Sequence, residues 1–133
     1  MSITNSTYLP NVFCLEITGF RPHIRVEFKN GVLVCARDFD PADRNIAPTP
    51  EQWLCFWREC EAIGVWAWEE CYDSEWCDGY GWSIKMEYSG HLLESWGNNN
   101  YPGVVPFPME SQGREWPRFI RAVERLLGGL SLT

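Results

Sequence analysis

The chain has 133 residues, of which 45% are hydrophobic and 22% are charged, and its formal net charge is −7 at pH 7. This length suits one domain, residues 1–133, that buries a core without disulfides or a metal, and the apolar content argues against intrinsic disorder. The excess of acidic residues argues against direct nucleic-acid binding and against anionic membranes, because lysine and arginine lead both interactions.

The N-terminal sequence carries no basic segment followed by an apolar one, and the longest apolar runs, 32–36 and 63–68, are too short to cross a bilayer. We therefore expect a cytoplasmic protein without membrane contact. The 6 cysteines are expected to remain reduced in that compartment.

Alternating apolar and polar residues predict a strand over 12–18 and a hairpin over 24–37. Asn30-Gly31 supplies the two positive-φ residues of a type I′ turn. That turn pairs Phe28 with Leu33 and Val26 with Cys35 on one buried face. The prolines and acids of 38–50 indicate a polar connection.

Thr49-Pro50-Glu51-Gln52 combines a helix cap, a proline at the first helical position and a capping-box glutamine. Apolar residues then recur at three- and four-residue spacing, which predicts a helix near 50–63 that Gly64 ends. The alternation of Trp66 and Trp68 predicts a strand over 65–70.

A second hairpin is predicted from strands 82–88 and 91–96, with Lys85 opposite Glu94. An irregular loop near 97–113, rich in Asn, Pro and Gly, leads to a helix near 115–127 with Arg114, Arg118, Arg121 and Arg125 along one side. This arginine row is typical of the solvated face of an amphipathic helix and is a weak signal for phosphate binding.

The order of these elements predicts an α+β fold. An antiparallel sheet of five to six strands would be built from hairpins, with both amphipathic helices packed on one of its faces.

Acidic and aromatic residues are interleaved between the first helix and the second hairpin, with no Lys or Arg among them. Negative potential beside aromatic anchors is typical of specific protein interfaces, whereas acids that serve only solubility do not need aromatic neighbours. The candidate partner-binding residues are Glu69, Glu70, Tyr72, Asp73, Glu75, Trp76, Asp78 and Tyr80.

The sequence offers little support for catalysis or for a metal site. Cys55 and Cys60 fall within a helix, and the spacing of Cys71 and Cys77 is not that of a zinc site. A thiol centre drawn from Cys71 and His91 has nothing in the sequence to bring its members together. We expect no enzyme activity, no cofactor and no metal, with a thiol or zinc enzyme as the least favoured alternative.

Three motifs resemble those of a loose set of small bacterial proteins: Trp66-x-Trp68-x3-Tyr72, Asp78-Gly79-x2-Trp82 and Gly97-x-Asn99-x-Tyr101-Pro102. The resemblance covers about residues 50–127 and implies a shared fold without catalytic residues.

By analogy, small acidic one-domain proteins are similar to bacterial immunity proteins and phage inhibitors, which neutralise basic partners. We therefore predict a non-enzymatic module that binds a basic protein, such as a toxin, a nuclease or a nucleic-acid-binding effector. The alternative is a carbohydrate or small-ligand domain that uses exposed tryptophans and the asparagines of 98–100.

Reversal of Asp73 and Glu75 to lysine should weaken partner binding because it inverts the charge of the block, while the thermal midpoint changes little. A binding assay beside a thermal melt of Asp73→Lys, Glu75→Lys checks this. Undiminished binding by that variant would contradict the predicted site.

Overall fold

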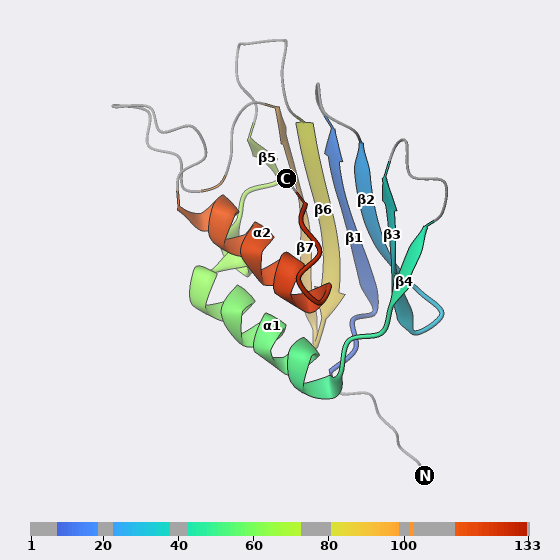
Figure 1. Cartoon of the computed structure of the whole chain (residues 1–133). Helices are drawn as coiled ribbons and strands as arrows, with labels where there is room; N and C mark the ends of the chain where they lie inside the picture. Colours follow the sequence, from blue (N-terminus) through green and yellow to red (C-terminus); the bar gives the residue numbers. More distant parts are fainter. Residues whose placement is uncertain are drawn as a thin grey trace.

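Alternating residues along the strands give the protein one sheet with one buried face. The computed structural model describes residues 8–18, 23–37, 43–72, 81–98, 102 and 114–132. Its seven strands lie in the order β4-β3-β2-β1-β6-β7-β5 (Figure 1). They are β1 (Val12–Thr18), β2 (Ile24–Lys29), β3 (Val32–Arg37), β4 (Arg44–Ile46), β5 (Cys71–Tyr72), β6 (Gly81–Tyr88) and β7 (His91–Asn98).

Both predicted hairpins are confirmed. Phe28 pairs with Leu33 and Val26 with Cys35, and the turn residues Asn30 and Gly31 have φ of 52° and 84°. In the second hairpin Lys85 lies opposite Glu94, with its Nζ 3.6 Å from Glu94 Oε1.

The predicted α+β class is confirmed, but the number and direction of the strands were partly wrong. The sheet has seven strands and is mixed, because β5 pairs with β7 in parallel, Cys71 beside Trp96. Strand β4 lies within the segment predicted as a connection and pairs with β3. Strands of two and three residues are too short to show alternation in the sequence.

The strand predicted over 65–70 was wrong. Val65–Ala67 forms a 3-10 turn, η1, directly after the left-handed Gly64, which ends the preceding helix with φ 87°. The turn places Trp66 against Trp57, with ring centroids 6.2 Å apart, while Trp68 enters the core. Two tryptophans two residues apart fit this turn as well as a strand, so their spacing did not distinguish them.

Helix α1 (Pro50–Ile63) is confirmed with its predicted bounds. Thr49 Oγ1 accepts from the backbone N–H of Gln52 at 3.1 Å, and Gln52 Oε1 accepts from the backbone N–H of Thr49 at 2.8 Å. This reciprocal capping box satisfies two N–H groups that the first turn would otherwise leave unpaired.

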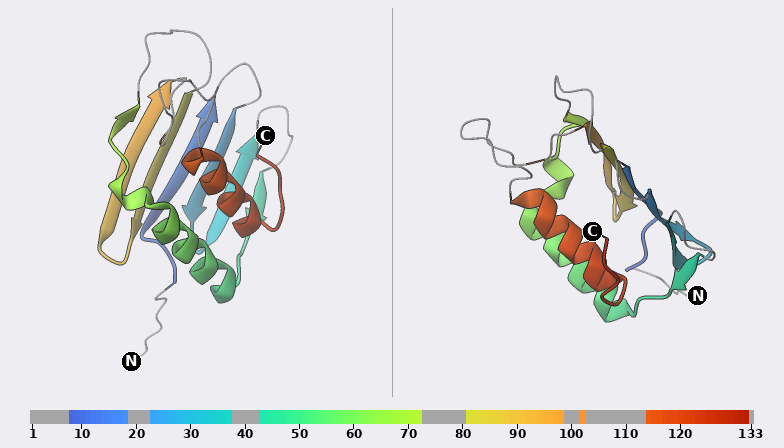
Figure 2. Two further views of the ribbon diagram at one scale, coloured as in Figure 1. Left: turned by 90° about the vertical axis from the view of Figure 1, so that its left-hand side faces the viewer. Right: turned by 45° about the horizontal axis from the view of Figure 1, so that its top comes forward.

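Helix α2 (Glu115–Leu126) is also confirmed and contacts α1. Both helices lie on the same face of the sheet, and no described element covers the opposite face (Figure 2). Beyond α2, the chain turns through Gly128 and Gly129, which have φ of 74° and 96°, and Leu132 returns to the core.

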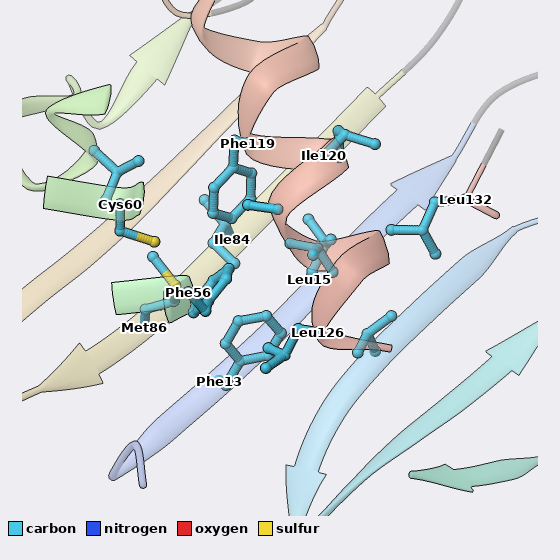
Figure 3. Packing of buried hydrophobic residues seen from close by; sticks show 14 of the residues in the cluster. Phe13, Leu15, Phe56, Cys60, Ile84, Met86, Phe119, Ile120, Leu126 and Leu132 are labelled. Atoms are coloured by element: carbon cyan, nitrogen blue, oxygen red, sulfur yellow. The ribbon is translucent and has the colours of Figure 1, made fainter. Parts of the chain in front are cut away.

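The core fills the space between the helices and the sheet (Figure 3). Phe13, Leu15, Ile84 and Met86 come from the central strands, and Phe119 belongs to the opposing helical residues. All five are at least nine-tenths buried, so these side chains hold the two layers together. No described helix is long and apolar enough to span a membrane.

Trp53 is 0% exposed, and its ring packs edge-on against Phe13, Phe28 and Phe56. Trp53→Ala should lower the free energy of unfolding by about 3–5 kcal/mol because it leaves a large cavity. The control Leu54→Ala, at a side chain 39% exposed, should cost less than about 1 kcal/mol. Urea denaturation followed by circular dichroism measures both, and equal losses would contradict this assignment of the core.

Candidate functional site

The predicted acidic and aromatic block begins at the edge of the sheet. Glu69 and Glu70 are exposed between η1 and β5, and Tyr72 in β5 is half-buried. The remaining predicted residues, Asp73, Glu75, Trp76, Asp78 and Tyr80, lie outside the described residues.

The backbone that carries Glu69 and Glu70 is fixed to β7. The Glu70 carbonyl accepts from the backbone N–H of Trp96 at 2.9 Å, and the Glu69 carbonyl accepts from Ser95 Oγ at 2.5 Å. Ser95 is buried, so its hydroxyl is satisfied by this bond. The two exposed carboxylates therefore project from a backbone of defined position.

Tyr72 supports this segment from the core side. Its hydroxyl accepts from the backbone N–H of Glu69 at 2.9 Å, and its ring lies 5.9 Å from that of Trp82. Burial raises the pKa of the Tyr72 hydroxyl, so the group stays protonated. These contacts hold the chain in place around Glu69.

The tryptophans divide between core and surface. Trp66 is half-buried, and Trp96 is 41% exposed. The buried members are Trp53, Trp57, Trp68, Trp82 and Trp116. Trp96 is thus the most exposed tryptophan in the described part of the chain, and the candidate list from the sequence did not include it.

The pairing of β6 with β7 explains the exposure of Trp96. On the core face of the sheet, the large side chains of Trp82 and Ile84 in β6 lie opposite Gly97 and Ser95 in β7. These two residues of β7 are small. The alternate residues Leu92, Glu94 and Trp96 consequently point to the open face, and Leu92 is 55% exposed. The two small residues beside Trp96 were the sequence signal for this orientation.

A charged network crosses the same open face on β1 and β2. Glu16 Oε1 accepts from Arg25 Nη1 at 2.6 Å, and Glu16 Oε2 lies 2.9 Å from His23 Nε2. Arg25 also approaches Glu27 at 3.4 Å, and Lys29 lies 3.6 Å from Glu27. Positive and negative groups alternate here, whereas Glu69 and Glu70 lie at an acidic edge.

A hollow of about 760 Å³ lies between the helices, lined by Phe56 and Leu126 together with polar residues such as Glu51 and Glu59. Arg118 Nε and Nη2 donate to Glu59 at 2.6 and 3.1 Å, and Arg125 lies 3.9 Å away. Two members of the arginine row thus bind α1, and the hollow contains none of the predicted partner-binding residues.

The described residues do not bring Cys71 and His91 together as a thiol centre, and Cys77 lies outside the described part of the chain. Cys71 pairs with Trp96 late in β7, whereas His91 begins that strand about 16 Å away. Burial raises the pKa of Cys60 far above its usual range, so this thiol is not a nucleophile. Among the described residues, no group of three or more His, Cys, Asp and Glu side chains is placed to hold a metal ion.

Comparison with known proteins gives no match, because no family model, curated protein or solved structure aligns significantly with the chain. The resemblance based on the tryptophan, Asp-Gly and Tyr-Pro motifs remains a prediction. The site is therefore interpreted from its own residues.

The hydrogen bond from Arg118 lowers the pKa of Glu59, so the ion pair stabilises the fold above the ordinary carboxyl pKa of about 4.3. This contribution is lost as the pH falls through the lowered pKa. At pH 7, Glu59→Gln should cost about 0.2–1 kcal/mol. Thermal melts from pH 7 to acid should show the wild type and Glu59→Gln converging, and a constant difference would contradict this role.

Proposed function

We propose that the protein is a non-enzymatic binding module that recognises a basic protein through the β5–β7 side of its sheet. The observation that supports this most directly is the exposed indole of Trp96 on β7, the strand to which the segment carrying the exposed Glu69 and Glu70 is hydrogen-bonded. An aromatic anchor beside fixed like charges is suited to a protein partner of opposite charge.

The charge distribution favours a basic partner. The whole chain has a formal net charge of −7, which attracts a cationic protein over long range and speeds its association. At close range Glu69 and Glu70 supply negative charge, and Asp73, Glu75 and Asp78 follow directly in the sequence. Lys85 and Glu94 are both more than half exposed, so their ion pair adds little to the fold.

The apolar part of the proposed interface lies on the open face of β7. Trp96 and Leu92 are large, exposed and on the same side of one strand. Tryptophan is frequent among residues whose truncation weakens binding strongly. Trp76 and Tyr80 are proposed as further anchors, and Tyr72 as the residue that positions Glu69.

The class of partner remains the one proposed from the sequence, a toxin, nuclease or nucleic-acid-binding effector. Such proteins carry basic surfaces that bind phosphates. An acidic module can block such a surface by presenting carboxylates in place of phosphates, which requires no catalytic group. Inhibitor or immunity protein is the corresponding biological role.

A carbohydrate or small-ligand domain is the second candidate, favoured by the exposed ring of Trp96. A neutral sugar would quench tryptophan fluorescence with little dependence on salt, because no net charge is paired on binding. Binding of a basic protein would weaken as the salt concentration rises.

The test compares wild type with Glu69→Lys, Glu70→Lys as bait for the source cell's lysate at low and raised salt. A matched control, Asp43→Lys, Glu51→Lys, reverses exposed acids before β4 and in the first turn of α1, away from β5 (Figure 1). Each reversal adds two charge units, so both variants move the net charge from −7 to −3. We expect a basic protein to be retained by wild type and by the control and lost from the site variant.

The captured protein is then purified, and its dissociation constant is measured with the three baits. The site variant should weaken binding about tenfold or more, and raised salt should weaken binding to wild type. Equal binding by wild type and the site variant would overturn this location. Equal losses of binding in the site variant and the control variant would show that only the net charge of the protein matters, which would also overturn it.

A further inference from the structure

The open face of the sheet contains a hollow of about 200 Å³ at the β1–β6–β7 end where Thr18 and Gly81 lie. Ser83 pairs with Glu16 on one side and with Trp96 on the other, so these two larger side chains flank a serine. Gly81 has no side chain on this face and keeps the surrounding surface low. The volume is below the 300–1,000 Å³ of sites for drug-sized molecules, so the hollow suits one side-chain group.

The Glu16 wall presents a carboxylate in a fixed position. Arg25 and His23 each engage one of its oxygens, at 2.6 and 2.9 Å. An ionised carboxylate offers about four acceptor positions, so about two remain for a donor from outside. The side chain is 30% exposed, which leaves it accessible from the hollow.

The Trp96 wall presents an aromatic ring. The neighbouring residues Ser95 and Gly97 face the core and are buried, so neither of them covers the indole on the open face. A cation over an indole face is attracted by the negative charge of the π system. Trp96 and Glu16 lie two strands apart, at a backbone separation of about 10 Å, so a flat group above Ser83 reaches both.

We propose that this hollow receives an arginine side chain of the basic partner, with the guanidinium stacked on the Trp96 indole and donating hydrogen bonds to Glu16. This inference rests on the proposed function and assigns it a specific anchor. Arginine fits better than lysine because its planar, weakly hydrated fork both stacks on a ring and donates in a fixed geometry.

The surrounding charges favour a cation in this position. Arg25 and Lys29 are each paired within the network that Glu16 and Glu27 complete. The charges of Arg25 and Lys29 are therefore offset by those of Glu16 and Glu27. The remaining attraction for the incoming guanidinium comes from Glu69, Glu70 and the net charge of −7. The backbone bond between Glu70 and Trp96 joins this acidic segment to the strand that carries the indole.

The probe is the tripeptide acetyl-Gly-Arg-Gly-amide, titrated into the ¹⁵N-labelled full chain and followed by the Trp96 indole N–H and the Ser83 amide signals. The comparison peptides replace arginine with lysine or with citrulline, a neutral group of nearly the same shape. We expect saturable shifts with the arginine peptide, weaker shifts with lysine and the smallest with citrulline.

Two variants separate the hollow from the rest of the molecule. Trp96→Ala should raise the dissociation constant of the arginine peptide about fivefold or more. The control Leu54→Ala removes an exposed side chain from α1, outside the proposed interface, and should leave the dissociation constant unchanged. Thermal melts establish that both variants fold.

Absence of saturable shifts at Trp96, or equal shifts with citrulline, would overturn the arginine anchor. Shifts with a monosaccharide such as N-acetylglucosamine but not with arginine would assign the hollow to a sugar instead. These outcomes are independent of the partner assay. If Glu69→Lys, Glu70→Lys abolishes capture of the basic protein but the arginine peptide does not bind, the proposed function stands without this anchor. If the arginine peptide binds but the same variant captures the basic protein as wild type does, only the location at the acidic edge fails.

Discussion

Burial of aromatic rings between two helices and one face of the sheet is the interaction on which the rest of the structure depends. Trp53 and Trp57 of α1 stack with ring centroids 5.7 Å apart, and Trp116 of α2 lies 4.6 Å from Trp82 of β6. Such large rings bury much apolar area per residue. Because one face of the sheet supplies the core, the other face can carry polar and functional side chains.

The division of the sheet into two faces also determines how the proposed site is built. Ser95, buried on the core face of β7, holds the Glu69 carbonyl, while its neighbour Trp96 points into solvent and binds the next carbonyl through its backbone. Strand β7 therefore positions an exposed indole and an acidic segment at once. A site held by strand backbone keeps its geometry better than one on a loop alone.

Much of the fold could be predicted from local patterns, because capping boxes, type I′ turns and alternation act over a few residues. Helix α1 and the Lys85–Glu94 pair were predicted correctly for this reason. The 3-10 turn at Val65–Ala67 and the parallel strand β5 depend on contacts with Trp57 and β7, which no local pattern records. For the proposed site, the charge pattern pointed to Glu69 and Glu70 but not to Trp96, whose exposure follows from the pairing of Gly97 and Ser95 with Trp82 and Ile84.

The sheet ends in very short strands on both sides, three residues in β4 and two in β5. Short edge strands offer little unpaired backbone, which protects a sheet against adding further strands from other chains. A partner of the proposed kind would therefore meet little unpaired main chain at β4 and β5, and we expect side chains to carry its recognition. Since the open face lies opposite the core, substitutions there would alter the proposed interface while the packing of the helices is preserved.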